Sequence, residues 1–387
     1  MHPPIARPEV LSLRTSKIRE VANAAWGRDG VLTFWFGESD RPTPAFIREA
    51  AAAALTEGRT FYTHNLGTAE LRGALTDYLG ELHGVAIGED RVAVTNSGVN
   101  ALMIAAQAVV SPGDRVVVVT PVWPNVMEIP RILSAQMQAV SLEAAQGRWR
   151  LDLDRLMDAL TPGTKALFLN SPNNPTGWTL PAEDRAAILA RCRELGIWLI
   201  ADDVYERLSF APGVSAPSLL PLVTGEDRVI STNSFSKAWR MTGWRLGWMV
   251  LPPALLDPVG VLLEYNTSCA PDFVQTAAAT ALREGGPHVA ELRAELTAAR
   301  DQVLGALRAM PGVEAPEPEG GMYAFFRIAG CTDSVALATR LIDEAGVGLA
   351  PGAAFGDEGE GWLRWCFAHR PEKNAEGLAR LGRFLAT

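Results

Sequence analysis

The chain has 387 residues, of which 48% are hydrophobic and 20% charged, a composition typical of a folded globular protein rather than a disordered one. Its 35 Lys and Arg against 44 Asp and Glu give a formal net charge of −9, which argues against a nucleic-acid partner because no broad basic surface is available. No apolar run reaches the roughly 18 residues that a membrane-spanning helix requires. The length exceeds the roughly 250–300 residues at which a single core stops growing, so we expect two domains.

The cysteines and histidines give no sign of a metal site or of a disulfide framework. Cys192, Cys269, Cys331 and Cys366 are scattered without paired spacing, and the five histidines are equally dispersed. The N-terminal segment contains no apolar core of the kind found in signal peptides. We therefore predict a cytoplasmic protein with no membrane partner and no metal.

The predicted elements, in chain order, begin with a helix over residues 16–26 and a Pro-containing loop, GESDRPTP, at 37–44. Short apolar runs then alternate with amphipathic stretches between about residues 91 and 250. This alternation is typical of βαβ units and predicts an α/β fold with a mostly parallel sheet sandwiched by helices. The predicted strands are 91–95, 115–120, 165–170, 197–202, 228–233 and 246–250, with helices at 101–110 and 182–194 among the connections.

After about residue 271 the pattern becomes helical up to residue 310, and a Pro- and Glu-rich segment, PGVEAPEPEGG, follows. Strand-like runs at 322–328 and 362–368 then alternate with helical stretches at 334–345 and 372–385. This is the pattern of an α+β unit. We predict a large domain over residues 46–274 and a smaller α+β domain formed by 1–45 together with 275–387.

Polar residues follow five of the predicted strands, at the sheet edge where open α/β folds bind their ligands. Ser97 precedes a helix whose N-terminus suits a phosphate, and Trp123, between two prolines, can stack on a planar ring. The turn SPNNPTG leaves Asn174 free to act, and Asp202 ends an apolar strand. The fifth strand leads to Lys237, with an arginine shortly after it.

Each of these features also has an ordinary explanation: Ser97 as a helix cap, Trp123 as core packing, Asp202 as a cap or ion pair, and Lys237 as surface. Ordinary explanations of this kind would have to coincide at five consecutive strand ends. Together the residues could hold a phosphorylated, planar, cationic heteroaromatic aldehyde, with a lysine for its Schiff base and an acid for its ring nitrogen. The sequence therefore predicts pyridoxal phosphate as cofactor.

Four motifs resemble those of fold type I, class I/II aminotransferases: TPVWPN (120–125), NSPNNPTG (170–177), ADDVYE (201–206) and SFSKAWRMTGWRLG (234–247). The resemblance spans essentially the whole chain, because GESDRPTP, FYTHNLGTAELRGAL, LAPGAAFG and RWCFAHRPE follow the family's order. It implies a pyridoxal-phosphate enzyme that is a homodimer with shared active sites.

The resemblance also implies residue roles. Lys237 is implied as the Schiff-base lysine and proton carrier, Asp202 as partner of the ring nitrogen, and Tyr205 and Asn174 as donors to the ring's phenolic oxygen. Trp123 is implied to stack on the ring. The cofactor site further includes Ser97, Gly98, Val99, Ser234, Arg245 and, from the neighbouring subunit, Tyr62. Substrate binding is assigned to Gly37, Asn174 and Arg364, with Arg364 clamping the α-carboxylate.

The implied reaction is transfer of an amino group between an L-amino acid and a 2-oxo acid by a ping-pong route, with 2-oxoglutarate as an expected partner. A pyridoxal-phosphate-dependent β-eliminating lyase remains the alternative, since it can share nearly all these residues. A transcriptional regulator with such a core would need an added DNA-binding segment. Two residues depart from the family pattern: Arg240 replaces a small residue, and Val99 occupies a position where aspartate-specific relatives often carry a basic residue.

Overall fold

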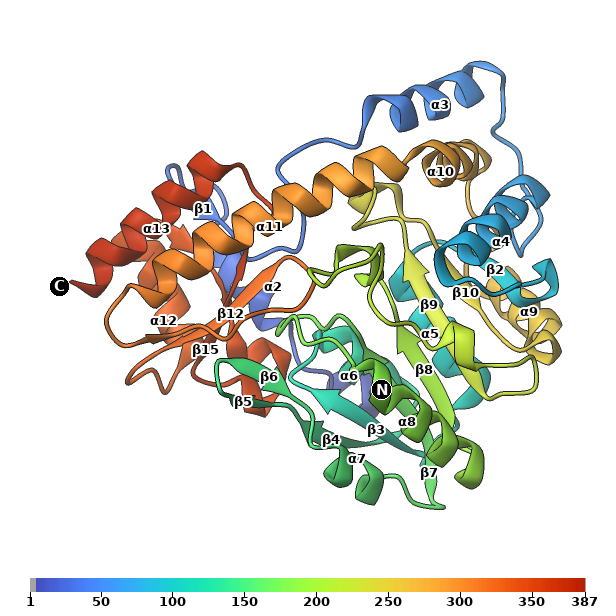
Figure 1. Cartoon of the computed structure of the whole chain (residues 1–387), viewed down its shortest axis with the longest axis horizontal. Coiled ribbons are helices and arrows are strands. Elements are labelled where there is room, and N and C mark those ends of the chain that lie inside the picture. Colours follow the sequence, from blue (N-terminus) through green and yellow to red (C-terminus); the bar gives the residue numbers. More distant parts are fainter. Residues whose placement is uncertain (1–4, 387) are drawn as a thin grey trace.

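Short apolar runs form a seven-stranded sheet at the centre of the computed structural model, which describes residues 5–386 (Figure 1). The strands are β2 (Val92–Thr95), β3 (Arg115–Thr120), β4 (Gln136–Ser141), β7 (Thr164–Asn170), β8 (Trp198–Asp202), β9 (Val229–Ser234) and β10 (Gly247–Val250). Their order is β2-β10-β9-β8-β7-β3-β4, and only β10 runs antiparallel to its neighbours. The predicted α/β fold with a mostly parallel sheet is confirmed.

All six predicted strands are present, with ends that differ by at most one residue from those predicted. The strand β4, which lies at the sheet edge and is only partly buried, is not among the predicted strands. Its sequence, QMQAVS, contains no continuous apolar run, and an edge strand with a solvent-facing side needs none.

Both faces of the sheet are buried, and successive residues of a strand contribute to opposite cores. In β3, Val116 and Val118 belong to one hydrophobic cluster, and Val117 and Val119 belong to the other. The first cluster includes residues of α5 (Gly98–Val109), α6 (Pro124–Ile132) and α9 (Leu256–Thr267). The second includes residues of α3 (Ala45–Thr56), α4 (Ala69–His83), α7 (Leu153–Ala159), α8 (Ala182–Leu195) and α10 (Asp272–Glu284).

The smaller unit is built on a four-stranded antiparallel sheet of order β11-β12-β15-β14. Its strands are β11 (Val313–Glu314), β12 (Tyr323–Ile328), β14 (Ala350–Pro351) and β15 (Trp362–Cys366), accompanied by α12 (Ser334–Arg340) and α13 (Pro371–Leu385). The N-terminal segment joins this unit, since β1 (Leu32–Thr33) pairs with β13 (Val347–Gly348), and α2 (Lys17–Ala24) packs on β14 and α12. The other short elements are α1 (Pro8–Leu11) and the hairpin of β5 (Glu143–Ala145) and β6 (Arg148–Arg150).

The long helix α11 (Gly286–Arg308) connects the two units and runs from α10 to α13 (Figure 1). The helix α10 packs on α3 and α4 of the larger unit, and the predicted domain boundary between residues 274 and 275 falls inside it. The division into 46–274 and 1–45 with 275–387 stays a prediction. Within residues 5–386, no helix combines the length and the apolar character needed to cross a membrane.

Gly247 allows β10 to lie close to the start of α5. A Cβ atom at this position would lie 2.6 Å from the carbonyl oxygen of Asn233 and 2.7 Å from the amide nitrogen of Gly98. Both are backbone atoms that cannot move without shifting the strand or the helix. The position therefore requires glycine for steric reasons.

We expect Gly247→Ala to lower the free energy of unfolding by about 1–3 kcal/mol, as overpacking of a core does. The matched control is Gly305→Ala in α11, where a Cβ would have nothing within 4 Å and alanine should stabilise the helix by about 0.5–1 kcal/mol. Urea unfolding of the cofactor-free variants measures both effects. Equal effects at the two positions would contradict the steric argument.

Candidate active site

A cavity of about 510 Å³ lies at the carboxyl ends of the parallel strands, where residues of the larger and the smaller unit meet. This is the edge at which the sequence analysis placed the site. Eleven of the thirteen predicted site residues line the cavity: Gly37, Gly98, Val99, Trp123, Asn174, Asp202, Tyr205, Ser234, Lys237, Arg245 and Arg364. The topology of the sheet thus brings together residues that are far apart in the sequence.

One end of the cavity carries hydrogen-bond donors suited to an anion. Ser97 caps α5, because its Oγ accepts the backbone N–H three residues later at 3.0 Å, and α5 itself starts at Gly98. The first N–H groups of a helix have no partner within the helix and attract negative charge. The Ser234 hydroxyl and the Arg245 guanidinium line the same cavity. This end is therefore a ready anion site.

Asp202, at the end of β8, is fully buried on the cavity wall. Within the described residues its carboxylate accepts one hydrogen bond, from the backbone N–H of Val204 at 3.3 Å. Burial raises the pKa of Asp202 to about 7, while the hydrogen bond and the charge of Lys237 act in the opposite direction. The carboxylate thus lacks a full set of partners, and a cation placed against it would restore its normal ionised state.

Lys237 follows β9, and its Nζ donates a hydrogen bond to the carbonyl of Gly37. The amine also lies 5.9 Å from the centre of the Tyr205 ring. Burial lowers the pKa of Lys237 to about 8, and the positive charges of Arg364 and Arg245 act in the same direction. About a tenth of the amine is therefore unprotonated at pH 7, far more than for an ordinary lysine.

The opposite wall is formed by a buried arginine. Arg364, on β15, is 2% exposed and donates to Asn174 Oδ1 at 2.8 Å and to the carbonyl of Trp35. Its guanidinium lies 4.4 Å from the centre of the Tyr323 ring, and the Tyr323 hydroxyl is 2.7 Å from that of Tyr205. Nε of Arg364 is buried and has no hydrogen-bond partner within the described residues. The arginine is thus fixed in place but keeps capacity for a further acceptor.

Two predicted residues do not line the cavity. Ser97 lies directly behind it as the buried cap of α5. Tyr62 lies outside it, and 90% of this residue is exposed. A single chain therefore brings no contact between Tyr62 and the cavity, and the predicted role of Tyr62 depends on a second subunit.

Tyr323 and Ser236 both line the cavity but are not among the predicted site residues. Ser236 lies within the motif SFSK, and its Oγ is 2.9 Å from that of Ser234, so the motif itself carried the signal. Tyr323 starts β12 of the smaller unit, and no local pattern distinguishes it from a core tyrosine. Its phenol fills the space beside Gly37, where a Cβ would lie 2.0 Å from the Tyr323 hydroxyl oxygen.

Arg240, which departs from the family pattern, forms an ion pair with Glu295 of α11. The same carboxylate binds Arg41, which follows the loop of Gly37. Glu295 thus links the segment after Lys237 to the segment that provides its carbonyl partner. Thr43 strengthens this link, because its hydroxyl donates to the carbonyl of Arg240 at 2.6 Å.

The fold and the cavity together are those of fold type I pyridoxal-phosphate enzymes: an α/β sheet with a lysine, an acid and an anion site at its carboxyl edge. The family model for aminotransferase class I and II matches residues 33–381. The chain belongs to this family and is an aminotransferase.

Several relatives and solved structures match almost the whole chain. An aspartate aminotransferase of Pyrococcus horikoshii is 32% identical over 379 residues, covering 97% of this chain and 96% of the relative. An aromatic-amino-acid aminotransferase of Thermococcus litoralis is 32% identical over 375 residues, covering 96% and 95%. The structure of a Thermus thermophilus aspartate aminotransferase mutant superposes with a TM-score of 0.90 at 31% identity and covers 98% of this chain and 100% of that chain. Relatives at equal identity thus carry different substrate names.

Members of this family depend on pyridoxal phosphate, and the predicted cofactor is confirmed. The cavity fits this group on its own chemistry. Gly98, whose Cβ would lie 3.0 Å from Cβ of Ser234, begins α5 on the cavity wall, and Arg245 lines the same cavity, so both can contact a phosphate there. The incompletely partnered Asp202 suits a cationic ring nitrogen, and the largely desolvated amine of Lys237 suits an aldehyde.

The lowered pKa of Lys237 predicts a pH-dependent stability effect in the cofactor-free protein. The folded chain releases the lysine proton near pH 8, whereas an unfolded chain keeps it to about 10.5. Between these values the unfolded state binds more protons, so the stability of the wild-type protein rises with pH. Lys237→Met should therefore raise the free energy of unfolding at pH 7, and the gain should shrink above pH 8. Urea unfolding at pH 7 and 9.5 measures this change, and a pH-independent gain would contradict it.

Proposed function

We propose that this aminotransferase moves the amino group of an L-amino acid to a 2-oxo acid by a ping-pong route, with 2-oxoglutarate as acceptor. The observation that carries the proposal is the buried Arg364 guanidinium, which shares the cavity with Lys237. A guanidinium binds a carboxylate through two parallel hydrogen bonds. Amino acids and 2-oxo acids have the α-carboxylate in common, so one arginine can serve both half-reactions at the same site.

The cofactor, when bound, supplies a carbonyl carbon for the incoming amine and a ring that withdraws electrons from the substrate Cα. Lys237 is proposed to take the proton from Cα, and its pKa of about 8 leaves free base available near neutrality. Asp202 is proposed to keep a proton at the ring nitrogen. Asn174 accepts from Arg364 through Oδ1, which leaves its amide N–H groups free to donate to the phenolic oxygen.

Tyr205 is the second proposed donor to that oxygen. Its hydroxyl forms a hydrogen bond with that of Tyr323, and when Tyr323 donates, Tyr205 keeps its own proton to donate elsewhere. Burial raises the pKa of Tyr205 well above its usual value, so this proton is retained across the physiological pH range. Trp123, which lines the cavity, is proposed to stack on the ring.

The proposed amino-acid substrate is monocarboxylic, with an apolar or aromatic side chain. Apolar side chains of Ile18, Phe36, Val99 and Leu102 line the cavity. Val99 carries no charge for a distal carboxylate. An exposed cation, Arg19, also lies on the cavity wall, so aspartate belongs in the test as the competing substrate.

We further propose a homodimer in which Tyr62 reaches the phosphate group in the partner subunit. The support is a set of exposed aromatic side chains: Phe61 is 83%, Tyr62 90% and Tyr265 84% exposed. Aromatic residues are enriched at interfaces, and water-exposed ones gain free energy when a partner covers them. A cytoplasmic location is also proposed, supported by four cysteines that are all free thiols.

The proposal is tested by adding single amino acids to the yellow holoenzyme and following the loss of its yellow absorbance. Transamination predicts a stoichiometric loss that 2-oxoglutarate reverses, fastest with apolar or aromatic amino acids. A β-eliminating lyase would instead release ammonia continuously with no acceptor present. Borohydride reduction followed by peptide mapping should place the cofactor on Lys237, and an adduct on Lys17 or Lys165 would contradict the assignment.

Arg364→Ala should weaken both half-reactions. Loss of a charge-assisted hydrogen bond of about 1.5–3 kcal/mol lowers kcat/KM by roughly ten- to a hundredfold for the amino acid and for the 2-oxo acid alike. Arg340→Ala is the control, because Arg340, the last residue of α12, pairs with Glu344 of the following helical turn, and both side chains are exposed. Steady-state kinetics with both substrates varied measures the change. A loss confined to one substrate would argue against a shared carboxylate site.

A further inference from the structure

The loop between α3 and α4 carries two exposed aromatic residues on a firmly hydrogen-bonded base. Phe61 and Tyr62 at its tip are 83% and 90% exposed. By contrast, the end of the loop packs tightly: Leu66 accepts a hydrogen bond from Val94 of β2 at 3.0 Å, and Gly67 has a φ of 101°. A Cβ at Gly67 would lie 2.4 Å from Cγ2 of Val94. The base of the loop is therefore fixed while its tip points to solvent.

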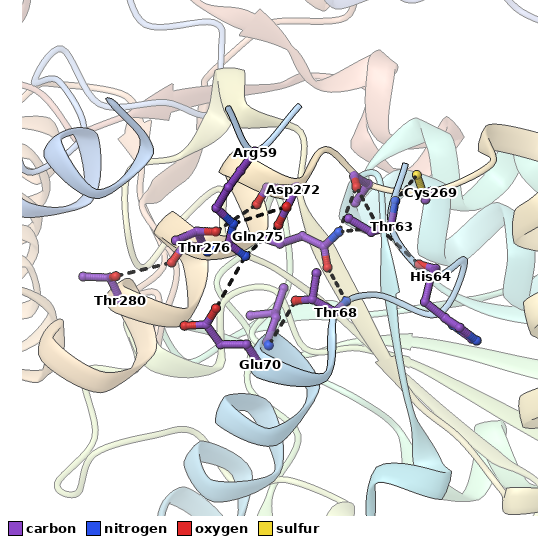
Figure 2. Close-up of polar contacts among 12 residues, drawn as sticks. Arg59, Thr63, His64, Thr68, Glu70, Cys269, Asp272, Gln275, Thr276 and Thr280 are labelled. Carbon is purple, nitrogen blue, oxygen red and sulfur yellow. Dashed lines mark hydrogen bonds and ion pairs between the residues drawn. The ribbon is translucent and has the colours of Figure 1, made fainter. Parts of the chain in front are cut away.

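A single buried side chain, Gln275 of α10, holds this base together (Figure 2). Its Oε1 accepts from the backbone N–H of Thr68 at 2.7 Å, and its Nε2 donates to Thr63 Oγ1 at 2.9 Å and to the carbonyl of Ala270 at 2.8 Å. The residue is 0% exposed. We call these four residues, Gln275, Thr63, Thr68 and Ala270, the Gln275 clamp. Thr63 and Thr68 lie on the two sides of the last turn of the loop, so the clamp holds that turn from both sides.

A second contact between the loop and α10 involves a residue that precedes the tip in the sequence. Arg59 donates to both carboxylate oxygens of Asp272, at 2.8 and 3.2 Å, and its guanidinium lies 3.7 Å from Glu70 (Figure 2). The backbone N–H of Thr63 also contacts Cys269 Sγ at 3.4 Å. The first turn of α10 and the residues before it thus fix the loop at several points around Tyr62.

We propose that Gln275 is a positioning residue for the active site of the partner subunit: it holds the loop so that Tyr62 reaches the partner's cofactor phosphate. This inference rests on the proposed dimer and on the proposed role of Tyr62. A hydroxyl on a freely moving loop contributes little binding free energy, because ordering the loop costs entropy, whereas a pre-fixed loop avoids that cost. Loss of Gln275 would remove the partner of the partly buried N–H of Thr68, and the loop would have to move to find another.

A competing explanation is that Gln275 supports the site of its own subunit. Asn96, next to the cap of α5, donates to the carbonyl of Cys269 at 3.3 Å, and Ala270 is part of the Gln275 clamp. A change at Gln275 could reach the phosphate end of its own cavity by this route. The two explanations predict opposite results in mixed dimers.

The first measurement is the dissociation constant of pyridoxal phosphate, taken on dimeric protein. Gln275→Leu keeps the side-chain volume but removes all three hydrogen bonds, and we expect it to weaken cofactor binding roughly tenfold. Tyr62→Phe should change the constant in the same direction, and the double variant should be no worse than the poorer single one. Thr280→Val on the same helix is the control, because among residues 5–386 the Thr280 hydroxyl bonds only to the carbonyl of Thr276 within α10 (Figure 2).

The deciding experiment combines Gln275→Leu chains with Lys237→Ala chains in one dimer. The only intact Lys237 then lies in the Gln275→Leu chain, and the loop that serves its site comes from the other chain, whose Gln275 is intact. We expect this hybrid to show about half the activity of the wild-type dimer, with wild-type cofactor affinity at the working site. The proposal would be overturned if the hybrid had no higher activity and cofactor affinity per working site than the Gln275→Leu homodimer. It would also be overturned if the wild-type protein were monomeric by light scattering.

A second pair of variants covers the case in which Gln275→Leu fails to fold. Thr63→Val removes only the hydroxyl of the clamp, and Thr63→Ser restores it. The valine variant should bind the cofactor more weakly than the wild type, and its cofactor affinity should recover in a hybrid with Lys237→Ala chains. The serine variant should behave as wild type. Wild-type affinity in the Thr63→Val homodimer would contradict the inference. Failure of the proposed function would give a different result: the wild-type holoenzyme would show no half-reaction with any amino acid.

Discussion

The desolvation of charged groups at the carboxyl edge of the sheet is the constraint on which the site depends. Asp202 and Lys237 are both removed from water in one cavity, which disfavours their ionised forms unless partners are supplied, and the buried Arg364 lines the same cavity. The chain itself supplies only some of these partners. The remaining partners must come from bound groups of complementary charge. The free energy of binding therefore depends on the charged side chains that the fold leaves without a full set of partners.

The rest of the fold maintains this arrangement. The two hydrophobic cores bury both faces of the sheet, and the strand ends are therefore held at fixed spacing. Helix α5 directs its N-terminus to the anion end, while β12 and β15 of the smaller unit bring Tyr323 and Arg364 to the opposite wall. Glu295 pairs with Arg240, shortly after Lys237, and with Arg41, shortly after Gly37. It therefore joins these two segments of the chain. A rigid scaffold of this kind reduces the reorganisation needed when substrate binds.

Much of the site could be predicted from the sequence because it is coded locally. The strand ends near Asn174, Asp202 and Lys237 can be recognised in the sequence, because an apolar run stops there at a polar residue. Tyr323 could not be predicted in this way, since it comes from a separate sheet and its role depends on tertiary contact with Tyr205. The strand β4 was missed because partial burial leaves no apolar run. Gln275 looks like any helical glutamine until its complete burial and three hydrogen bonds are known.

The placement of Arg364 and Lys237 on different units has a mechanical consequence. Arg364 belongs to β15 of the smaller unit, and Lys237 follows β9 of the larger one. A molecule held at its carboxylate by the first and at its amino-bearing carbon by the second is a cross-link between the two bodies. Such a cross-link resists shear between them. In every α-amino acid the carboxylate is bonded directly to the amino-bearing carbon, so the span between the two points of attachment is the same whatever the side chain.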